Sequence, residues 1–304
     1  METIAGLRPA LPRVVTDPSL VRAILADRGY TVPDPGRNAP PGSMAWLRQN
    51  VARHSNGADH ARRRGLTEDL LRGLDPGSLR ARAREAAGAA IDQAAGRPFD
   101  AMALVARRVP GRVLAAALGA ADPDLATDQL PVAAAAYLPG APDRGQADAS
   151  VARLAGLLPA GPDEQVAARI GLLVQAYAAT AGLIGSAVAA GLAAASGPAP
   201  SPGPAAALVA QALRGAPPVR QTRRVAPSGE TIALDLTAGG DDPAGPAAFG
   251  FGPHACPGAG PATALAEGAA GPLLARCRPA GAPARCPGAP AVRAPERLML
   301  VERA

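Results

Sequence analysis

The sequence predicts a mainly α-helical protein with a small β component, folded as a single domain over residues 1–304. Three observations lead to this fold class. Segments with helical spacing of apolar residues fill most of the chain, a pair of short alternating segments comes late, and there is no internal repeat. Because the helices come first and do not alternate with strands, the order argues against a wound parallel sheet.

The elements of the first 120 residues are mostly helices, expected at 17–27, 58–73, 77–95 and 100–120. The first helix follows a short strand that ends at Val15, and it begins with Asp17 as N-cap and Pro18 at the first helical position. The fourth is expected to begin with Asp100 as its cap and to kink at Pro110, because proline cannot donate the helical hydrogen bond.

The helical signal weakens over residues 121–163, where Pro and Gly recur, and returns in a long apolar helix at 163–195. The later elements are a linker at 196–204, a helix at 205–214, a hairpin of 222–226 with 231–237, a loop at 238–248 and a weak helix from 258 to 277. Residues 278–295 are of low complexity, and 297–302 can close a small sheet.

The charge of the chain comes from arginine, since none of the 31 basic residues is lysine, and the formal net charge is +6. A GC-rich genome explains this composition, and a basic face for an acidic partner is the alternative. The absence of zinc-finger spacing and the 2% of aromatic residues argue against a nucleic-acid partner. Without a signal peptide, and with no apolar run that we expect to span a bilayer, the sequence predicts a cytoplasmic protein with no membrane partner.

The cysteines number three, which does not make a disulfide framework and predicts free thiols. Cys256 lies in the segment Phe-Gly-Phe-Gly-Pro-His-Ala-Cys-Pro-Gly at 249–258, whose glycines allow tight turns and close approach to a ligand. A helix follows, so its first amide groups can point at the sulfur, lower the pKa of the thiol and favour the metal-binding thiolate. The upstream Phe can shield the sulfur from water. Cys286 lacks the Phe-Gly-x-Gly lead and is expected to be a surface thiol.

This segment resembles the heme-binding loop of the cytochrome P450 family, with Phe, two Gly, a basic residue, Cys and Gly at matching positions. The resemblance implies that Cys256 is the axial thiolate ligand of a heme b iron, a donor that favours O–O cleavage. It also implies that Phe249, His254 and Gly258 bind the cofactor.

The resemblance continues over most of the chain, as in a shortened bacterial member of soluble type. Residues 13–27 look like the family's opening strand and helix, and residues 100–120 look like a later helix of bacterial members. In Asp-His-Ala-Arg-Arg-Arg, His60 and Arg64 stand four residues apart and share one helix face, as in the family's propionate-binding pattern. Arg223 matches the next propionate arginine, and His254 the basic residue two before the cysteine.

The long helix at 163–195 departs from the family where it is similar to the central helix beside the oxygen site. The family's proton-relaying acid and Thr align with Ala178 and Ala179, which cannot relay protons. Thr180 lies one residue further, about 100° around the helix, and does not substitute directly. A slip of one residue in the alignment can give Thr180 the Thr role, but the acid is still missing.

Three further departures concern other regions. The family's Glu-x-x-Arg pair reads Gln211-x-x-Arg214, and breaking a buried ion pair typically costs about 3–5 kcal/mol. The loop at 238–248 is too short for the meander that usually precedes the Cys loop, and 121–163 is too short for the usual helices over the substrate pocket.

Together these features predict a P450-type monooxygenase that oxidises a small, mostly apolar metabolite in bacterial secondary metabolism. An acidic ferredoxin-type electron donor is expected to dock on a basic face near Arg62, Arg63 and Arg72. One alternative is an auxiliary protein that supports a partner enzyme such as a glycosyltransferase. Another is a heme enzyme that uses peroxide or does not activate oxygen. The intact Cys loop favours an enzyme, and the missing acid, Thr and Glu favour the alternatives.

Overall fold

The computed structural model describes residues 12–137, 144–194, 204–238, 247–282, 285–286 and 291–303. These residues form a helical body with two small sheets, which confirms the predicted mainly α fold with a small β component. The helices are α1 (Pro18–Ala26), α2 (Met44–Gln49), α3 (Gly57–Arg72), α4 (Pro76–Ala94), α5 (Val109–Ala117), α6 (Pro123–Tyr137), α7 (Arg144–Leu157), α8 (Asp163–Ala194), α9 (Ala205–Gly215) and α10 (Ala259–Arg276). Short helical turns are η1 (Ala52–His54), η2 (Met102–Ala106) and η3 (Gly252–His254).

Two three-stranded sheets flank the helices. The first contains β1 (Arg13–Val15), β4 (Thr231–Asp235) and β3 (Gln221–Val225), with β1 parallel to β4 and β3 antiparallel to it. The second contains β2 (Phe99–Asp100), β6 (Met299–Glu302) and β5 (Cys277–Pro279), all antiparallel. The predicted hairpin and the predicted closing strand near residue 300 are therefore confirmed. The predicted linker at 196–204 and the loop at 238–248 lie almost wholly outside the described residues.

The helix ends follow the expected capping chemistry in α1, where the Asp17 carboxylate accepts a hydrogen bond from the Leu20 N–H at 2.7 Å. The predicted helix at 100–120 is instead interrupted. Asp100 accepts hydrogen bonds from the N–H groups of Met102 and Leu298, both at 3.0 Å, and thereby joins η2 to the second sheet. The chain then passes through the wide turns of η2, and α5 begins at Val109 with Pro110 in its first turn, so the expected kink is a break between two helices.

The region between α5 and α8 holds more helix than its sequence signal indicates. Both α6 and α7 lie there and pack against each other, although Pro131 is inside α6. The small side chains of Ala126, Ala133 and Ala147 are fully buried. Packing between the two helices therefore outweighs their weak helical patterns.

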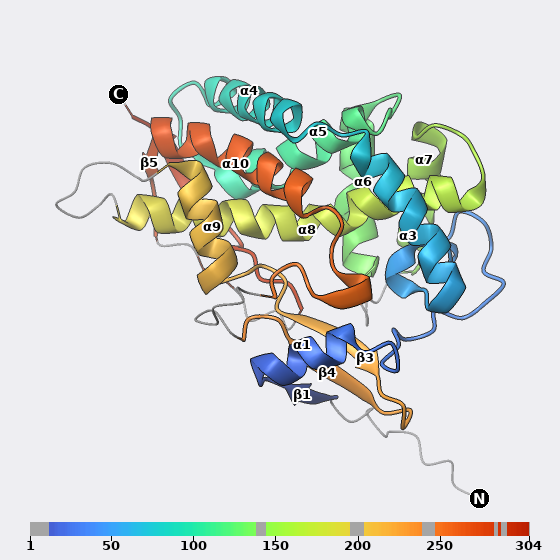
Figure 1. Ribbon diagram of the computed structural model, residues 1–304. Helices are drawn as coiled ribbons and strands as arrows, with labels where there is room; N and C mark the ends of the chain where they lie inside the picture. Colours follow the sequence, from blue (N-terminus) through green and yellow to red (C-terminus); the bar gives the residue numbers. More distant parts are fainter. Residues whose placement is uncertain are drawn as a thin grey trace, which may run out of the picture.

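The centre of the molecule is α8, which contacts α3, α5, α6, α7, α9 and α10 (Figure 1). It is long and apolar enough to cross a bilayer, contrary to the expectation from the sequence. More than half of its most apolar 18-residue stretch is buried inside the protein, so core packing accounts for this composition. On one side of α8, α10 lies against both α8 and α4, and Gly268 of α10 approaches the Arg80 carbonyl so closely that a Cβ atom would lie 2.3 Å from it.

On the other side, α1 and the first sheet form a smaller unit with its own apolar cluster (Figure 1). Val15, Val21, Leu25 and Ile232 are buried in it. The segment that leads to α10 packs directly on this unit. Gly252 has a φ of +68°, and a Cβ atom there would lie 2.4 Å from the Leu25 carbonyl oxygen, so only glycine fits. The end of α1 therefore supports the loop that carries Cys256.

Candidate cofactor site

The Cys loop, residues 249–258, folds back on itself before α10. The Cys256 N–H donates to the Phe249 carbonyl at 2.7 Å, and Gly250 adopts a φ of +72°, which favours glycine. Phe249 is half-buried, whereas Phe251 is 44% exposed and lies under the Arg22 guanidinium, 5.7 Å from its ring centroid. The sulfur-bearing side chain of Cys256 is accessible to solvent.

The thiol of Cys256 does not have the low pKa that the sequence predicts. Burial among surrounding protein atoms raises its pKa, although the Gly258 N–H hydrogen bond and the nearby Arg53 and Arg64 lower it. The Cys256 side chain can be both exposed and desolvated, because solvent reaches it from one direction while protein atoms surround it in the other directions. The predicted amide effect is present but smaller than the cost of burying a thiolate.

His60, Arg64 and His254 meet beside this loop. The rings of His60 and His254 are 4.0 Å apart between centroids. The Arg64 guanidinium donates to the carbonyl oxygens of Ala255 and Pro253, and to Glu68 at 2.5 Å. Two residues of α3 thus contact the Cys loop from the side opposite α1.

The arginine that joins this group from the first sheet is Arg224, not Arg223. In β3 the two residues point to opposite faces, and Arg223 is exposed while Arg224 is 4% exposed. Arg224 donates to the Arg223 carbonyl at 2.8 Å and to the Thr222 hydroxyl at 3.4 Å, both neutral acceptors. Burial, and then the charge of Arg53, lower its pKa to about 10. Because adjacent strand residues face opposite sides, Arg223 and Arg224 cannot both point toward this cluster.

The electrostatic character of this cluster is strongly basic. Burial is the largest cause of a His254 pKa of about 3, and His60, Arg224, Arg64 and Arg53 lower it further. Burial, Arg64, Arg224 and Arg28 also lower the pKa of His60, and Glu68 alone among the groups acting on it raises it. A buried guanidinium that contacts neutral acceptors is costly unless an anion joins it. The donor set therefore fits a group with carboxylates, placed beside a sulfur ligand for a metal.

The middle of α8 is accessible where its flanks are buried. The five residues from Gln175 to Ala179 are all partly exposed, whereas Val174 and Thr180 are buried. Ala178 shares a helix face with Gly171 and Gly182, and those glycines lie against Val51 and against Pro218 with Arg293. Thr180 is rotated about 200° from Ala178, is 2% exposed, and its hydroxyl has no hydrogen-bond partner among the described residues. Thr180 thus faces the core, away from the face of Ala178.

Gln211 and Arg214, which align with the family's Glu-x-x-Arg pair, do not form a buried pair in the structure. Both side chains are exposed at the end of α9. The cost of a broken buried ion pair therefore does not arise at this position.

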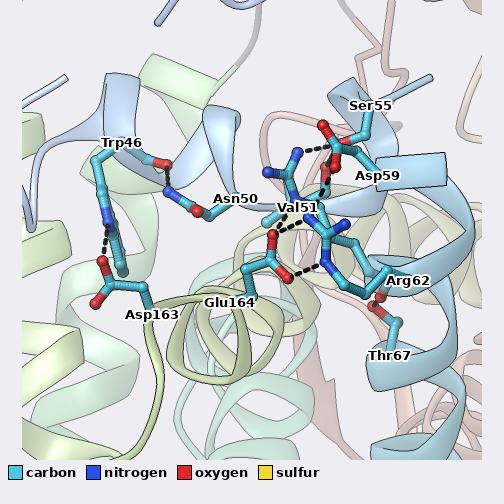
Figure 2. A network of polar contacts seen from close by, with 10 residues as sticks. Trp46, Asn50, Val51, Ser55, Asp59, Arg62, Thr67, Asp163 and Glu164 are labelled. Atoms are coloured by element: carbon cyan, nitrogen blue, oxygen red, sulfur yellow. Dashed lines mark hydrogen bonds and ion pairs between the residues drawn. The ribbon is translucent and has the colours of Figure 1, made fainter. Parts of the chain in front are cut away.

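The arginines expected to form a docking face for an electron donor are engaged in ion pairs, and Figure 2 shows the one between Arg62 and Glu164. Arg62 donates two hydrogen bonds to Glu164 at 2.8 and 2.7 Å, and Arg63 donates to the same carboxylate at 2.7 Å and to Ser55 at 2.6 Å. The Arg63 side chain is only 15% exposed, and Arg72 pairs with Asp69. These contacts, Arg62 first, lower the pKa of Glu164 to about 2. Arg62 and Arg63 thus join α3 to the start of α8 through Glu164, and each of the three arginines has an acidic partner.

Comparison with solved structures identifies the architecture. Neither the scan of family models nor the search of curated proteins gave a match. Among solved structures, P450BioI in complex with hexadec-9Z-enoic acid ligated acyl carrier protein is similar with a TM-score of 0.79 and 21% identity, over 95% of this chain and 92% of that one. CxnD, a cytochrome P450 enzyme for C–S bond formation in chuangxinmycin biosynthesis, has a TM-score of 0.77 and 18% identity, over 95% and 88%. PksS, the cytochrome P450 of the bacillaene polyketide synthase of Bacillus subtilis 168, has a TM-score of 0.76 and 18% identity, over 96% and 90%. With nearly all of both chains superposed in each case, the chain has the cytochrome P450 fold.

Proposed function

We propose that this protein is a heme-thiolate oxidoreductase of the cytochrome P450 type, a single cytoplasmic domain that binds one heme b. The observation that carries the proposal is the convergence of Cys256 with a group of basic side chains that includes Arg224, a buried guanidinium whose hydrogen-bond acceptors are neutral. A metal ion that accepts a thiolate accounts for the position of Cys256. Anionic carboxylates account for the basic side chains beside it. Heme b has both features, an iron that accepts a thiolate and two propionates.

The residues that hold the cofactor in this proposal come from three elements. Cys256 provides the axial ligand, while Arg64, Arg224, His60 and His254 bind the propionates; Arg224 replaces the Arg223 of the sequence comparison. Phe249 and Gly258 flank the sulfur, and the Gly258 N–H donates to it. When bound, heme b supplies the redox centre that activates oxygen or peroxide for oxidation of a substrate.

The substrate in this proposal is a small, mostly apolar metabolite that approaches the accessible stretch of α8 from Gln175 to Ala179. Alanines there offer apolar contact and exclude water, but they cannot hold or transfer a proton. Two of the similar structures belong to biosynthetic P450s, which supports a role in bacterial secondary metabolism. An acidic ferredoxin-type donor remains part of the proposal, with its docking surface away from the paired Arg62 and Arg63.

A second candidate function is favoured by Ala178, Ala179 and the inward-facing Thr180. A protein that holds heme without a proton relay can use peroxide, which already carries the needed protons, or can act as an auxiliary subunit for a partner enzyme such as a glycosyltransferase. These alternatives predict the same cofactor site and different turnover.

The test is a visible absorption spectrum of the purified, reduced protein under carbon monoxide. Thiolate ligation gives a red-shifted Soret band, which Cys256→Ala is expected to abolish. Cys286→Ala and Cys277→Ala are matched controls that should keep it. If Cys256→Ala retains the band, or if no variant binds heme, the proposed cofactor site is wrong.

A further inference from the structure

A second polar site lies where η1 meets the end of α6, and the cofactor assignment does not use it. His54 and Tyr137 pack edge to face there, with ring centroids 5.2 Å apart. Tyr137 is 4% exposed, yet its hydroxyl has no hydrogen-bond partner among the described residues, and neither has the buried Nε2 atom of His54. Two unpaired buried polar atoms on neighbouring rings carry a desolvation cost that a polar ligand group can offset.

The charge around this pair is positive. The Arg53 guanidinium lies over the Tyr137 ring, 6.0 Å from its centroid, and forms no ion pair with any residue in the described ranges. Arg48 is the second nearby cation, and its guanidinium donates to the Ala136 carbonyl at 2.5 Å. Burial, then Arg53, then Arg48 lower the pKa of His54 to about 3, so its imidazole is neutral at pH 7. The groups that shift His54 include no carboxylate.

The position of the pair connects it to the proposed substrate region. Val51, three residues before His54, packs against Gly171 of α8, one turn before Gln175. Arg53 also acts on the pKa of Cys256, His254 and Arg224, so its charge reaches the cofactor site as well as the His54–Tyr137 pair. Arg53 is exposed and His54 partly exposed, so solvent borders the pair on the side of these two residues.

We propose that Arg53, His54 and Tyr137 form a subsite for the carboxylate end of an organic substrate whose apolar body extends toward Gln175–Ala179. The inference rests on the proposed function, and it adds an anionic group to a substrate otherwise described as apolar. Arg53 supplies the charge, Tyr137 donates its hydroxyl hydrogen, and neutral His54 donates from Nε2 when that atom carries the proton. The apolar surroundings strengthen each of these contacts relative to water.

The experiment is a calorimetric titration of the purified protein with two carboxylates, decanoate and 4-phenylbutyrate, and with their methyl esters. The carboxylates are expected to bind at least about tenfold more tightly than the esters, the effect of one charge-assisted contact. Arg53→Gln should abolish this preference, and Tyr137→Phe should reduce it about threefold to tenfold. Arg82→Gln, an exposed arginine on α4, should leave it unchanged.

Equal binding of acids and esters by the wild-type protein overturns the proposal, and so does a preference that survives Arg53→Gln. If Arg53→Gln speeds heme loss and leaves the acid preference intact, Arg53 belongs to the cofactor cluster alone. Tyr137→Phe removes only a hydroxyl and keeps the packed ring, so it remains informative if Arg53→Gln folds poorly. Heat of binding is independent of the heme spectrum. The subsite can therefore fail while the thiolate band is present, or hold while Cys256 proves not to bind iron.

Discussion

The Cys loop and the middle of α8 differ in how many side chains they hold that can bind a ligand or transfer a proton. Around the loop, α3, β3 and the loop itself each contribute basic side chains to one cluster, and Arg224 is buried with neutral acceptors as its hydrogen-bond partners. Along α8, the two positions aligned with a proton relay hold alanine, and the neighbouring Thr180 faces the core. Under the proposed function, binding a cofactor and delivering protons to its far side are therefore separable properties.

The largest effect is expected from restoring the relay in α8. Ala178→Glu with Ala179→Thr should increase the share of electrons recovered in product instead of hydrogen peroxide, because a general acid typically contributes about 10²–10⁴-fold. The measurement is peroxide formed per electron pair, with a surrogate ferredoxin and a panel of substrates. Ala190→Thr, on an exposed part of α8, is the control.

If the wild-type protein already recovers nearly all electrons in product, protons arrive by another route. Poor coupling with oxygen and good turnover with peroxide supports the peroxide-using alternative. If neither oxidant gives turnover before or after the double substitution, the auxiliary function becomes the better explanation.

The next effect concerns the cofactor cluster. Arg224→Ala is expected to raise the heme dissociation rate about tenfold to hundredfold, since a hydrogen bond to a charged group is worth about 1.5–3 kcal/mol. Arg223→Ala should change it little, because that side chain is exposed. Transfer of heme to an apoprotein acceptor measures both rates. A larger increase with Arg223→Ala than with Arg224→Ala would assign the propionate contact to Arg223.

A smaller effect is expected at the network in Figure 2, which joins α3 to the start of α8. Glu164→Gln should lower the free energy of unfolding by about 1–2 kcal/mol, because Arg63 is mostly buried and loses its counterion. Glu85→Gln, on the exposed face of α4, should have almost no effect. Urea unfolding compares the two variants, and an equal loss in both would assign the effect to net charge alone.

The smallest effect is a pH dependence at His54. Its folded-state pKa of about 3 lies below the ordinary value of 6.5, so only the unfolded chain takes up this proton between the two values. Stability from this residue is therefore complete above pH 6.5 and falls with decreasing pH, by at most about 1.4 kcal/mol per unit. His54→Gln should reduce the slope of unfolding free energy between pH 6.5 and 5, and an unchanged slope would mean that His54 titrates normally.

Much of the fold could be predicted because local signals agree with tertiary packing. Asp17-Pro18 begins α1, and Pro227-Ser228-Gly229 turns the hairpin, as their side chains favour. By contrast, α2 was missed because it has only six residues, although Ser43 before Met44 gives a capping signal. The helices α6 and α7 were missed because their stability depends on contact with each other and not on apolar periodicity.

The candidate site was predictable in residue type and less so in detail. The spacing of His60 and Arg64 predicted one shared helix face, and in the structure both residues contact the Cys loop. The choice between Arg223 and Arg224 depends on which face of β3 is buried, and a run of two arginines carries no such information. The pKa of Cys256 depends on how many atoms surround the sulfur, which a sequence does not give. The His54–Tyr137 pair joins residues more than 80 positions apart and has no motif.

The support that α1 gives to the Cys loop also has a consequence for the order of folding. β1 pairs with β4 across more than 200 positions, and the backbone of α1 contacts Gly252, which precedes α10. During synthesis on the ribosome, this first part of the chain must wait without its partners until nearly everything else has emerged. Contacts of such long sequence separation form slowly. The contacts of α1 and β1 beneath the Cys loop are therefore expected to form last, which leaves a time window in which a large planar ligand can enter before β1 pairs with β4.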